Sequence, residues 1–153
     1  MIVSSHQRDF VRRDLPGDKR RLSLSLMLYL IVFLGAGIGG ALRHGVNVGA
    51  ARAFGYGFPL GTLIVNVLGS FMIGLFAGYF AFRPGIGQHV RLFLTTGLLG
   101  GFTTFSAFSL DTALLVERHS YAIAAGYVVG SIFASLVALF IGLALFERRI
   151  PLQ

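Results

Sequence analysis

In the middle of a long uncharged segment the chain reads Gly97-Leu98-Leu99-Gly100-Gly101-Phe102-Thr103-Thr104-Phe105-Ser106-Ala107-Phe108-Ser109. This stretch combines paired glycines with paired β-branched threonines, and both residue types are poor at holding a helix. A helix break at membrane depth is tolerated only inside protein or beside an aqueous cavity. The carbonyl groups that it frees are natural ligands for a small hard cation. These residues therefore predict a broken membrane-spanning helix.

Four charge-free stretches run along the chain, and the broken segment lies in the third. They extend between Arg21 and Arg43, from Ala53 to Phe82, from Leu92 to Leu110 and from Ser120 to Phe146. A helix needs roughly 20 mostly apolar residues to cross the hydrocarbon. Hydrophobic residues make up 55% and charged residues 12% of the chain, about half the charged share of a soluble domain. The composition predicts an all-α membrane protein with four transmembrane helices.

The expected organisation is a basic N-terminal tail over residues 1–21, a membrane domain over 22–149 and a C-terminal tail over 150–153. The spans are expected at about 22–42, 60–82, 90–115 and 121–146, with short connections that make consecutive helices antiparallel. Six basic residues and three aspartates in the first 21 residues favour contact with anionic lipid headgroups, or a solvated tail, over a nucleic-acid arm.

The charges beside the spans give little preference for one orientation. Outside the tail, one side is expected to carry Arg83, Arg91, Arg148 and Arg149, and the other Arg43, Arg52 and Arg118. Four against three is almost no positive-inside bias, although the tail tips the balance toward a cytoplasmic N-terminus. The membrane domain alone is therefore compatible with insertion either way up.

Two polar faces lie within the spans. Thr62, Asn66 and Ser70 are spaced by four on the second span, and Tyr127, Ser131 and Ser135 repeat that spacing on the fourth. Residues four apart share a helix face. Such faces either bind helices to one another or line a hydrated path, and serine and threonine alone favour the first interpretation because they can bond to their own helix. The helix backbone cannot fully satisfy the amide of Asn66.

Three further side chains allow a functional and a structural interpretation. Phe105 and Phe108 share a face just after the break, where their positive ring edges would attract an anion weakly. On spacing alone, packing in the core is the favoured interpretation of both phenylalanines. Arg43 closes the first expected span, and it either reaches the headgroups or supplies positive potential at an aqueous vestibule.

The residue inventory argues against an enzyme. The chain has no cysteine, no Asp or Glu in the interior of a span, and histidine only at positions 6, 44, 89 and 119, so no catalytic constellation is visible. The missing carboxylate also weighs against a proton-coupled exporter of cationic or drug-like molecules. That exporter, working as a small dual-topology dimer, is kept as the alternative function. A purely structural protein would leave Asn66 and the broken segment without a purpose.

Three stretches together resemble the Fluc (CrcB-like) fluoride channel family. They are Gly35-Ala36-Gly37-Ile38-Gly39-Gly40-Ala41-Leu42-Arg43, Gly61-Thr62-Leu63-Ile64-Val65-Asn66-Val67-Leu68-Gly69-Ser70-Phe71, and Gly100 to Ser109 of the broken segment. The resemblance covers about residues 28–147, and the latter two motifs are specific. The basic tail is longer than the family core needs. Ala107 and Asp111 stand where a threonine and a glutamate are more usual.

The resemblance implies an antiparallel, dual-topology homodimer of four-helix subunits with two fluoride paths. It also implies a structural sodium ion at the dimer centre, bound by backbone carbonyls of Gly100 and Thr103. On the matching positions, Asn66 would hydrogen-bond fluoride, and Phe105 and Phe108 would present ring edges. Tyr127, Ser131 and Ser135 would form a polar track, with Thr62 on the same path and Arg43 at its aqueous entrance.

The function implied is passive, selective export of cytoplasmic fluoride, which protects the cell against fluoride toxicity. The expected location is the cell (inner) membrane as a multi-pass protein. The expected partners are fluoride, the lipid bilayer and a second copy of the chain, with no nucleic acid.

Overall fold

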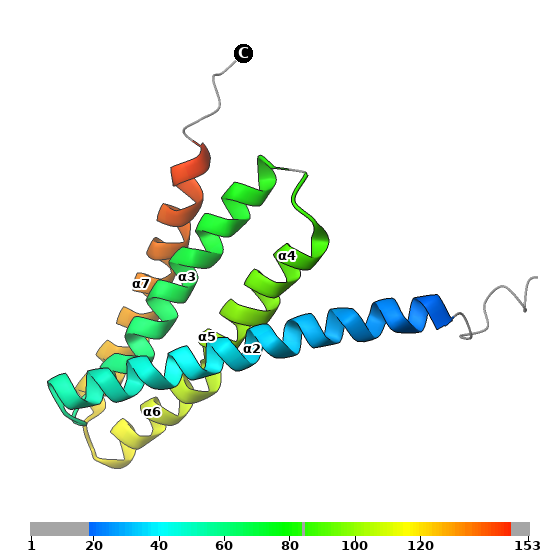
Figure 1. Cartoon of the computed structure of the whole chain (residues 1–153). Helices are drawn as coiled ribbons and strands as arrows, with labels where there is room; N and C mark the ends of the chain where they lie inside the picture. Colours follow the sequence, from blue (N-terminus) through cyan, green and yellow to red (C-terminus); the bar gives the residue numbers. More distant parts are fainter. Residues whose placement is uncertain (1–18, 84, 148–153) are drawn as a thin grey trace, which may run out of the picture.

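The computed structural model describes residues 19–83 and 85–147, all of them in helices or short connections (Figure 1). Four segments are long and apolar enough to cross a membrane, namely Leu22–Phe54, Leu60–Ala81, Gln88–Glu117 and Tyr121–Phe146. This confirms the all-α fold with four candidate spans. Residues 1–18, 84 and 148–153 lie outside the described part of the chain, and with them nearly all of the two expected tails.

The first helix, α2 (Lys19–Phe54), does not end at Leu42 as the sequence suggested. Residues 43–54 contain no proline, so the helix continues to Gly55. Gly55 has φ 81°, and its N–H bonds to the carbonyl of Ala51 at 2.9 Å, an ending that glycine favours. The 36 residues extend about 54 Å, well beyond a hydrocarbon core of about 30 Å.

Helices α3 (Leu60–Ala81) and α7 (Tyr121–Glu147) run side by side in the same direction (Figure 1). Glycines allow the two backbones to lie close together. A methyl group at Gly74 would collide with the backbone of Leu139, and one at Gly142 with the backbone of Phe71. Close approach of small residues allows tight packing of helices in lipid, so α3 and α7 form a closely packed pair.

The third span is built from four pieces: α4 (Gln88–Leu92), the π-helical η1 (Phe93–Leu99), α5 (Gly100–Phe102) and α6 (Phe105–Glu117). Helix α2 crosses η1 and α5 (Figure 1). Gly39 packs there against the backbone of Leu98, and Gly101 against that of Ala36. The crossing therefore fixes the half of the third span that precedes the break.

The other end of α3 is attached to the third span by Arg91. Its Nη2 donates to the carbonyls of Phe80 and Arg83, both at 3.1 Å. Its guanidinium also lies 5.2 Å from the centroid of the Phe80 ring. Carbonyls at a helix C-terminus lack helical partners and carry partial negative charge, so a cation there is stabilising.

The outer surface is apolar. Large side chains such as Leu22, Tyr29 and Phe33 on α2, and Phe133 and Phe140 on α7, are mostly exposed. A soluble protein rarely exposes contiguous apolar surface of this kind. Together with the four long helices, it identifies a multi-pass membrane protein.

Candidate functional site

The break in the third span lies at Thr103 and Thr104. Thr103 has ψ 156° and Thr104 has φ −155° and ψ 121°, which are extended conformations between α5 and α6. The N–H of Thr103 makes the last helical hydrogen bond before the break, to the carbonyl of Leu99 at 2.9 Å. The predicted interruption of the helix is confirmed.

Asn66 supports this break from α3. Its Nδ2 donates to the carbonyl of Thr104 at 3.0 Å, and its Oδ1 accepts the N–H of Thr104 at 2.9 Å. One side-chain amide thus satisfies both backbone groups of the extended residue. Buried backbone groups without partners would cost about 1–3 kcal/mol each, so Asn66 acts as a clamp on the break. The clamp leaves one N–H of Asn66 without a described partner.

The clamp has a consequence for the carbonyls of the break. In a continuous helix the N–H of Thr104 would bond to the carbonyl of Gly100, but here it bonds to Asn66. The N–H of Ala107 would bond to the carbonyl of Thr103, but it bonds to Oγ1 of Thr104, which caps α6, at 3.2 Å. The carbonyls of Gly100 and Thr103 therefore lose their helical donors.

Those two carbonyls suit a hard cation in chemical type, because sodium-sized hard ions prefer oxygen ligands. Gly100 is exposed and Thr103 is half-buried, so neither is sealed inside the subunit. Within residues 19–83 and 85–147 no group of three His, Asp or Glu side chains could hold a metal. A cation bound at the break would rely on backbone oxygens.

A cavity of about 530 Å³ with polar and apolar lining residues opens beside the break, and we call it the central cavity. Its lining includes most of the predicted site residues, namely Asn66, Gly100, Thr103, Phe105, Phe108, Ser131 and Ser135, together with Ser70 and Thr104. These residues come from α3, from both sides of the break and from α7. The structure therefore brings Asn66, both phenylalanines and two members of the α7 polar face to one place.

The two phenylalanines differ in burial. Phe108 is buried, whereas Phe105 is 78% exposed, and their ring centroids are 5.6 Å apart. Phe108 also packs against Tyr127 with 5.3 Å between centroids. Core packing therefore accounts for Phe108 but leaves the exposure of Phe105 unexplained within one subunit.

Ser131 is the other unusual polar residue of the central cavity. It is 4% exposed, and its Oγ has no hydrogen-bond partner among the described residues. A buried hydroxyl without a partner is destabilising. The hydroxyl of Ser131 is therefore available to hydrogen-bond a ligand or water in the central cavity.

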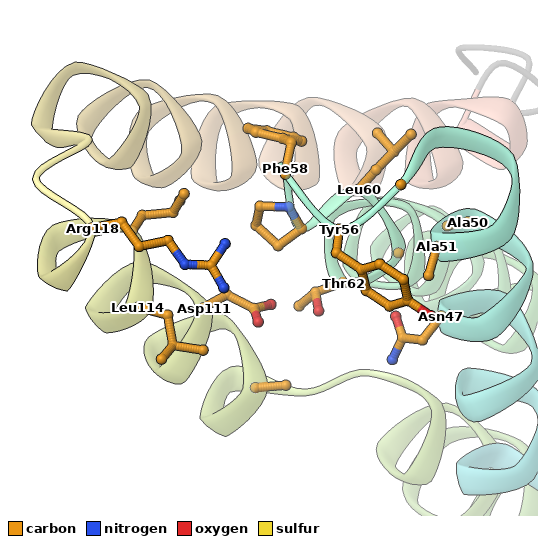
Figure 2. A pocket seen from close by; sticks show the side chains of 16 residues that line it. Asn47, Ala50, Ala51, Tyr56, Phe58, Leu60, Thr62, Asp111, Leu114 and Arg118 are labelled. Atoms are coloured by element: carbon orange, nitrogen blue, oxygen red, sulfur yellow. The ribbon is translucent and has the colours of Figure 1, made fainter.

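A second cavity of about 380 Å³, which we call the mouth cavity, lies where α2 ends and α3 begins. Figure 2 shows two side chains that reach into it opposite Asn47 of α2. They are Asp111, which lies in α6, and Arg118, which caps the C-terminus of α6. Thr62 also lines this cavity. The α3 face predicted from spacing is therefore divided, with Thr62 at the mouth and Asn66 and Ser70 in the central cavity.

Tyr127 stands between the two cavities. It is 2% exposed and lines neither cavity, but it contacts a lining residue of each. Its hydroxyl donates to Oδ2 of Asp111 in the mouth cavity at 3.4 Å, and its ring packs against Phe108 of the central cavity. Tyr127 therefore links the linings of the two cavities.

Two placements depart from the sequence interpretation. Arg43 lines neither cavity and lies inside α2, one turn before Asn47, because the helix continues past the expected end. Asn47 and Arg118 line the mouth cavity although the sequence did not single them out as site residues. The 3.6-residue period that places Asp111 and Arg118 on one face of α6 was the signal available for Arg118.

The fold and the cavities define a polytopic helical membrane protein with a polar, donor-lined site at a broken helix. Comparison with known proteins agrees. Residues 30–143 match the family model described as CrcB-like protein, Camphor Resistance (CrcB). The chain belongs to this family.

The match between this chain and its curated relatives extends over nearly the whole length of each relative. The chain is 57% identical over 119 residues, 78% of its length and 96% of the relative's, to "Fluoride-specific ion channel FluC" of Rhodopseudomonas palustris strain BisB5. It is 58% identical to the protein of that name from Granulibacter bethesdensis, over 82% of its own length and 98% of the relative's. "Fluoride-specific ion channel FluC 2" of Nitrobacter hamburgensis is 58% identical over 119 residues, 78% of this chain and 96% of that relative.

Proposed function

We propose that this protein is a fluoride-selective, passive ion channel of the cell (inner) membrane that exports cytoplasmic fluoride. The observation that carries the proposal is the identity of 57–58% to relatives named as fluoride-specific channels, over nearly their whole length. The donor-lined central cavity supports it. The protein is a channel and not an enzyme.

The site chemistry suits a compact anion. Fluoride holds its water tightly, so a narrow path must replace that water with hydrogen-bond donors. The remaining N–H of Asn66 and the hydroxyls of Ser131 and Ser135 are such donors, and the ring edges of Phe105 and Phe108 add weak attraction without a full charge. Weak attraction allows release as well as entry.

The path continues beyond the central cavity in this proposal. Tyr127 and Thr62 carry the ion from Phe108 to the mouth cavity, where the hydroxyl of Tyr127 already donates to Asp111. The family resemblance gives Arg43 a role at an aqueous entrance, and because Arg43 lines neither cavity, that entrance would lie outside both.

The membrane potential supplies the driving force. An inside-negative potential of 100 mV is worth roughly 2.3 kcal/mol per elementary charge. This corresponds to about a forty-fold difference in fluoride concentration. A passive channel therefore suffices to lower cytoplasmic fluoride, and no coupled ion is needed.

The working unit in this proposal is an antiparallel, dual-topology homodimer. The central cavity is bordered on its outer side by Phe105, Ile132 and Leu136, which are all more than half exposed. Facing lipid, the donors of the cavity would lie beside hydrocarbon, which is costly for polar groups. A second subunit over this side would enclose the path and cover Phe105.

A structural sodium ion at the dimer centre belongs to the same proposal. The carbonyls of Gly100 and Thr103 would hold it, since the Asn66 clamp and the Thr104 cap divert their helical donors. Bound there, sodium would neutralise the oxygens of two breaks and hold the subunits together.

A coupled exporter of cationic or drug-like molecules is less well supported. Proton coupling generally needs a carboxylate inside the membrane, and Asp111 lies at the mouth cavity beside Arg118. The donor set of the central cavity is suited to an anion.

The test is fluoride efflux from proteoliposomes that contain the purified protein, driven by a potassium potential and read with a fluoride electrode. We expect rapid fluoride efflux and little chloride efflux in a parallel measurement. Equal fluxes of the two halides, or none, would remove the channel assignment. Flux that requires a proton gradient would favour the exporter.

A further inference from the structure

The mouth cavity contains one cation and one carboxylate among its lining residues, Arg118 and Asp111. They lie two turns apart on the same face of the third span (Figure 2). Asp111 accepts the hydroxyl of Tyr127 and so lies at the inner end of the cavity. An anion that approaches Tyr127 and Phe108 through this cavity therefore meets a negative group just before the narrow part of the path.

Arg118 is free to act on that anion. It is the exposed C-terminal cap of α6, and its backbone N–H bonds to the carbonyl of Leu114 at 3.1 Å. Its side chain reaches into the mouth cavity toward Asp111 (Figure 2). Among the described residues no ion pair or side-chain hydrogen bond engages its guanidinium.

The contrast with Arg91 shows what a structural arginine looks like in this protein. The guanidinium of Arg91 donates to two carbonyls at the end of α3 and lies over the ring of Phe80. Arg118 makes no comparable contacts in the described part of the chain. Its charge is therefore available to a solute in the cavity.

We propose that Arg118 recruits the permeating anion into the mouth cavity and offsets the repulsion by Asp111. The proposal rests on the anion-channel function above. It assigns the positive charge of the mouth cavity to Arg118, the residue that caps the third span. A positive group at the rim of a cleft raises the local anion concentration and the rate of entry, and salt weakens this effect. Arg118 is therefore expected to change the rate at which anions enter the path.

A role of Arg118 in the entry step predicts how flux depends on fluoride concentration. Replacing Arg118 should lower flux when fluoride is scarce, because entry is then limiting. It should change little when fluoride saturates the path, because passage through the central cavity is then limiting. A residue needed only for folding would lower flux at every fluoride concentration.

The first experiment compares Arg118→Gln with Arg52→Gln in proteoliposomes. Arg52 is exposed in the last turn of α2 and does not line the mouth cavity, so it controls for general surface charge. At about 10 mM ionic strength and subsaturating fluoride, we expect Arg118→Gln to reduce flux about threefold, and the loss to disappear near 1 M potassium gluconate. Arg118→Lys should stay near the wild type, and Arg52→Gln should lose clearly less flux than Arg118→Gln.

The second experiment uses the absence of cysteine in the chain. Arg118→Cys can be modified with a positively or a negatively charged methanethiosulfonate reagent without any background reaction. The positive adduct should restore flux at low salt, whereas the negative adduct should lower it further. This comparison varies the charge on one folded protein.

Each outcome is decisive. The recruiting role alone would be overturned if the wild type conducts and Arg118→Gln conducts equally well. Equal losses in the two glutamine variants, or equal effects of the two adducts, would overturn it as well. Absence of fluoride flux in the wild type would instead overturn the proposed function.

Discussion

The third span and α7 are neighbours in sequence and similar in length, yet one is broken and the other is continuous. The third span contributes backbone groups to the central cavity, at Gly100, Thr103 and Thr104. The polar groups that helix α7 contributes are the hydroxyls of Ser131 and Ser135, which lie beside the apolar side chains of Ile132 and Leu136. Both lie beside the same cavity but supply different chemistry.

The difference teaches what a polar site in a membrane requires of its surroundings. Helix α7 keeps its backbone bonds, so the cost of a Ser131 hydroxyl without a described partner is confined to one side chain. The broken span needs a partner for every freed group, and Asn66 supplies two of these bonds from α3. Function is therefore coupled to folding in the third span and nearly independent of folding in α7.

The largest effect is expected from Asn66→Asp, which damages the support of the broken span. A carboxylate can still accept the N–H of Thr104, but it cannot donate to the carbonyl of Thr104. The loss of that bond, about 2 kcal/mol, corresponds to roughly a thirtyfold loss of fluoride flux if it acts on the open path. Proteoliposome efflux measures it, together with thermal unfolding in detergent.

Asn66→Leu separates the clamp from charge, because it removes both hydrogen bonds without adding a carboxylate. We expect it to lower both flux and the unfolding temperature. Wild-type flux and stability in Asn66→Leu would contradict the clamp.

A smaller effect is expected from Phe108→Ile. Phe108 lies where the third span contacts α7, through the ring of Tyr127. The substitution removes a ring edge from the path and an aromatic pair worth about 0.5–1.5 kcal/mol, so we expect about a fivefold loss of fluoride flux. Phe140→Ile on the exposed surface of α7 is the matched control and should conduct normally. Equal flux in the two variants would exclude Phe108 from the path.

The smallest effect is expected from Ser131→Ala on the continuous helix. The buried hydroxyl has no described partner, so its removal should leave stability unchanged or raise it by up to about 1 kcal/mol. Fluoride flux should fall about twofold to threefold. Thr112→Val is the control, because that hydroxyl bonds to the carbonyl of Phe108 on its own helix. A Ser131→Ala protein that is less stable but conducts fully would reverse the comparison.

The sequence was sufficient to predict the features that depend on local chemistry. Gly100-Gly101 and Thr103-Thr104 predicted the break, and the four charge-free stretches predicted the spans. Spacing by four predicted which residues share a face. These properties follow from residue type and helix period, which act within a few residues.

Features that depend on distant contacts were not accessible in this way. The clamp joins residues 38 positions apart, so the sequence indicated an unsatisfied Asn66 but not its partner. Helix α2 passed its expected end because the charge at Arg43 marks a limit of apolar sequence and not a limit of helix. The division of the α3 face between two cavities depends on how α6 packs against it.

The central claim is that the donors beside the break line a hydrated conduction path. Silver ion is small and reacts with thiols, and the chain has no cysteine of its own, so Ser135→Cys places a single target in the central cavity. We predict that silver rapidly blocks fluoride efflux through Ser135→Cys in chloride-free medium, while Phe140→Cys continues to conduct. Continued efflux through Ser135→Cys, with its thiol either modified or unreactive, would contradict the account.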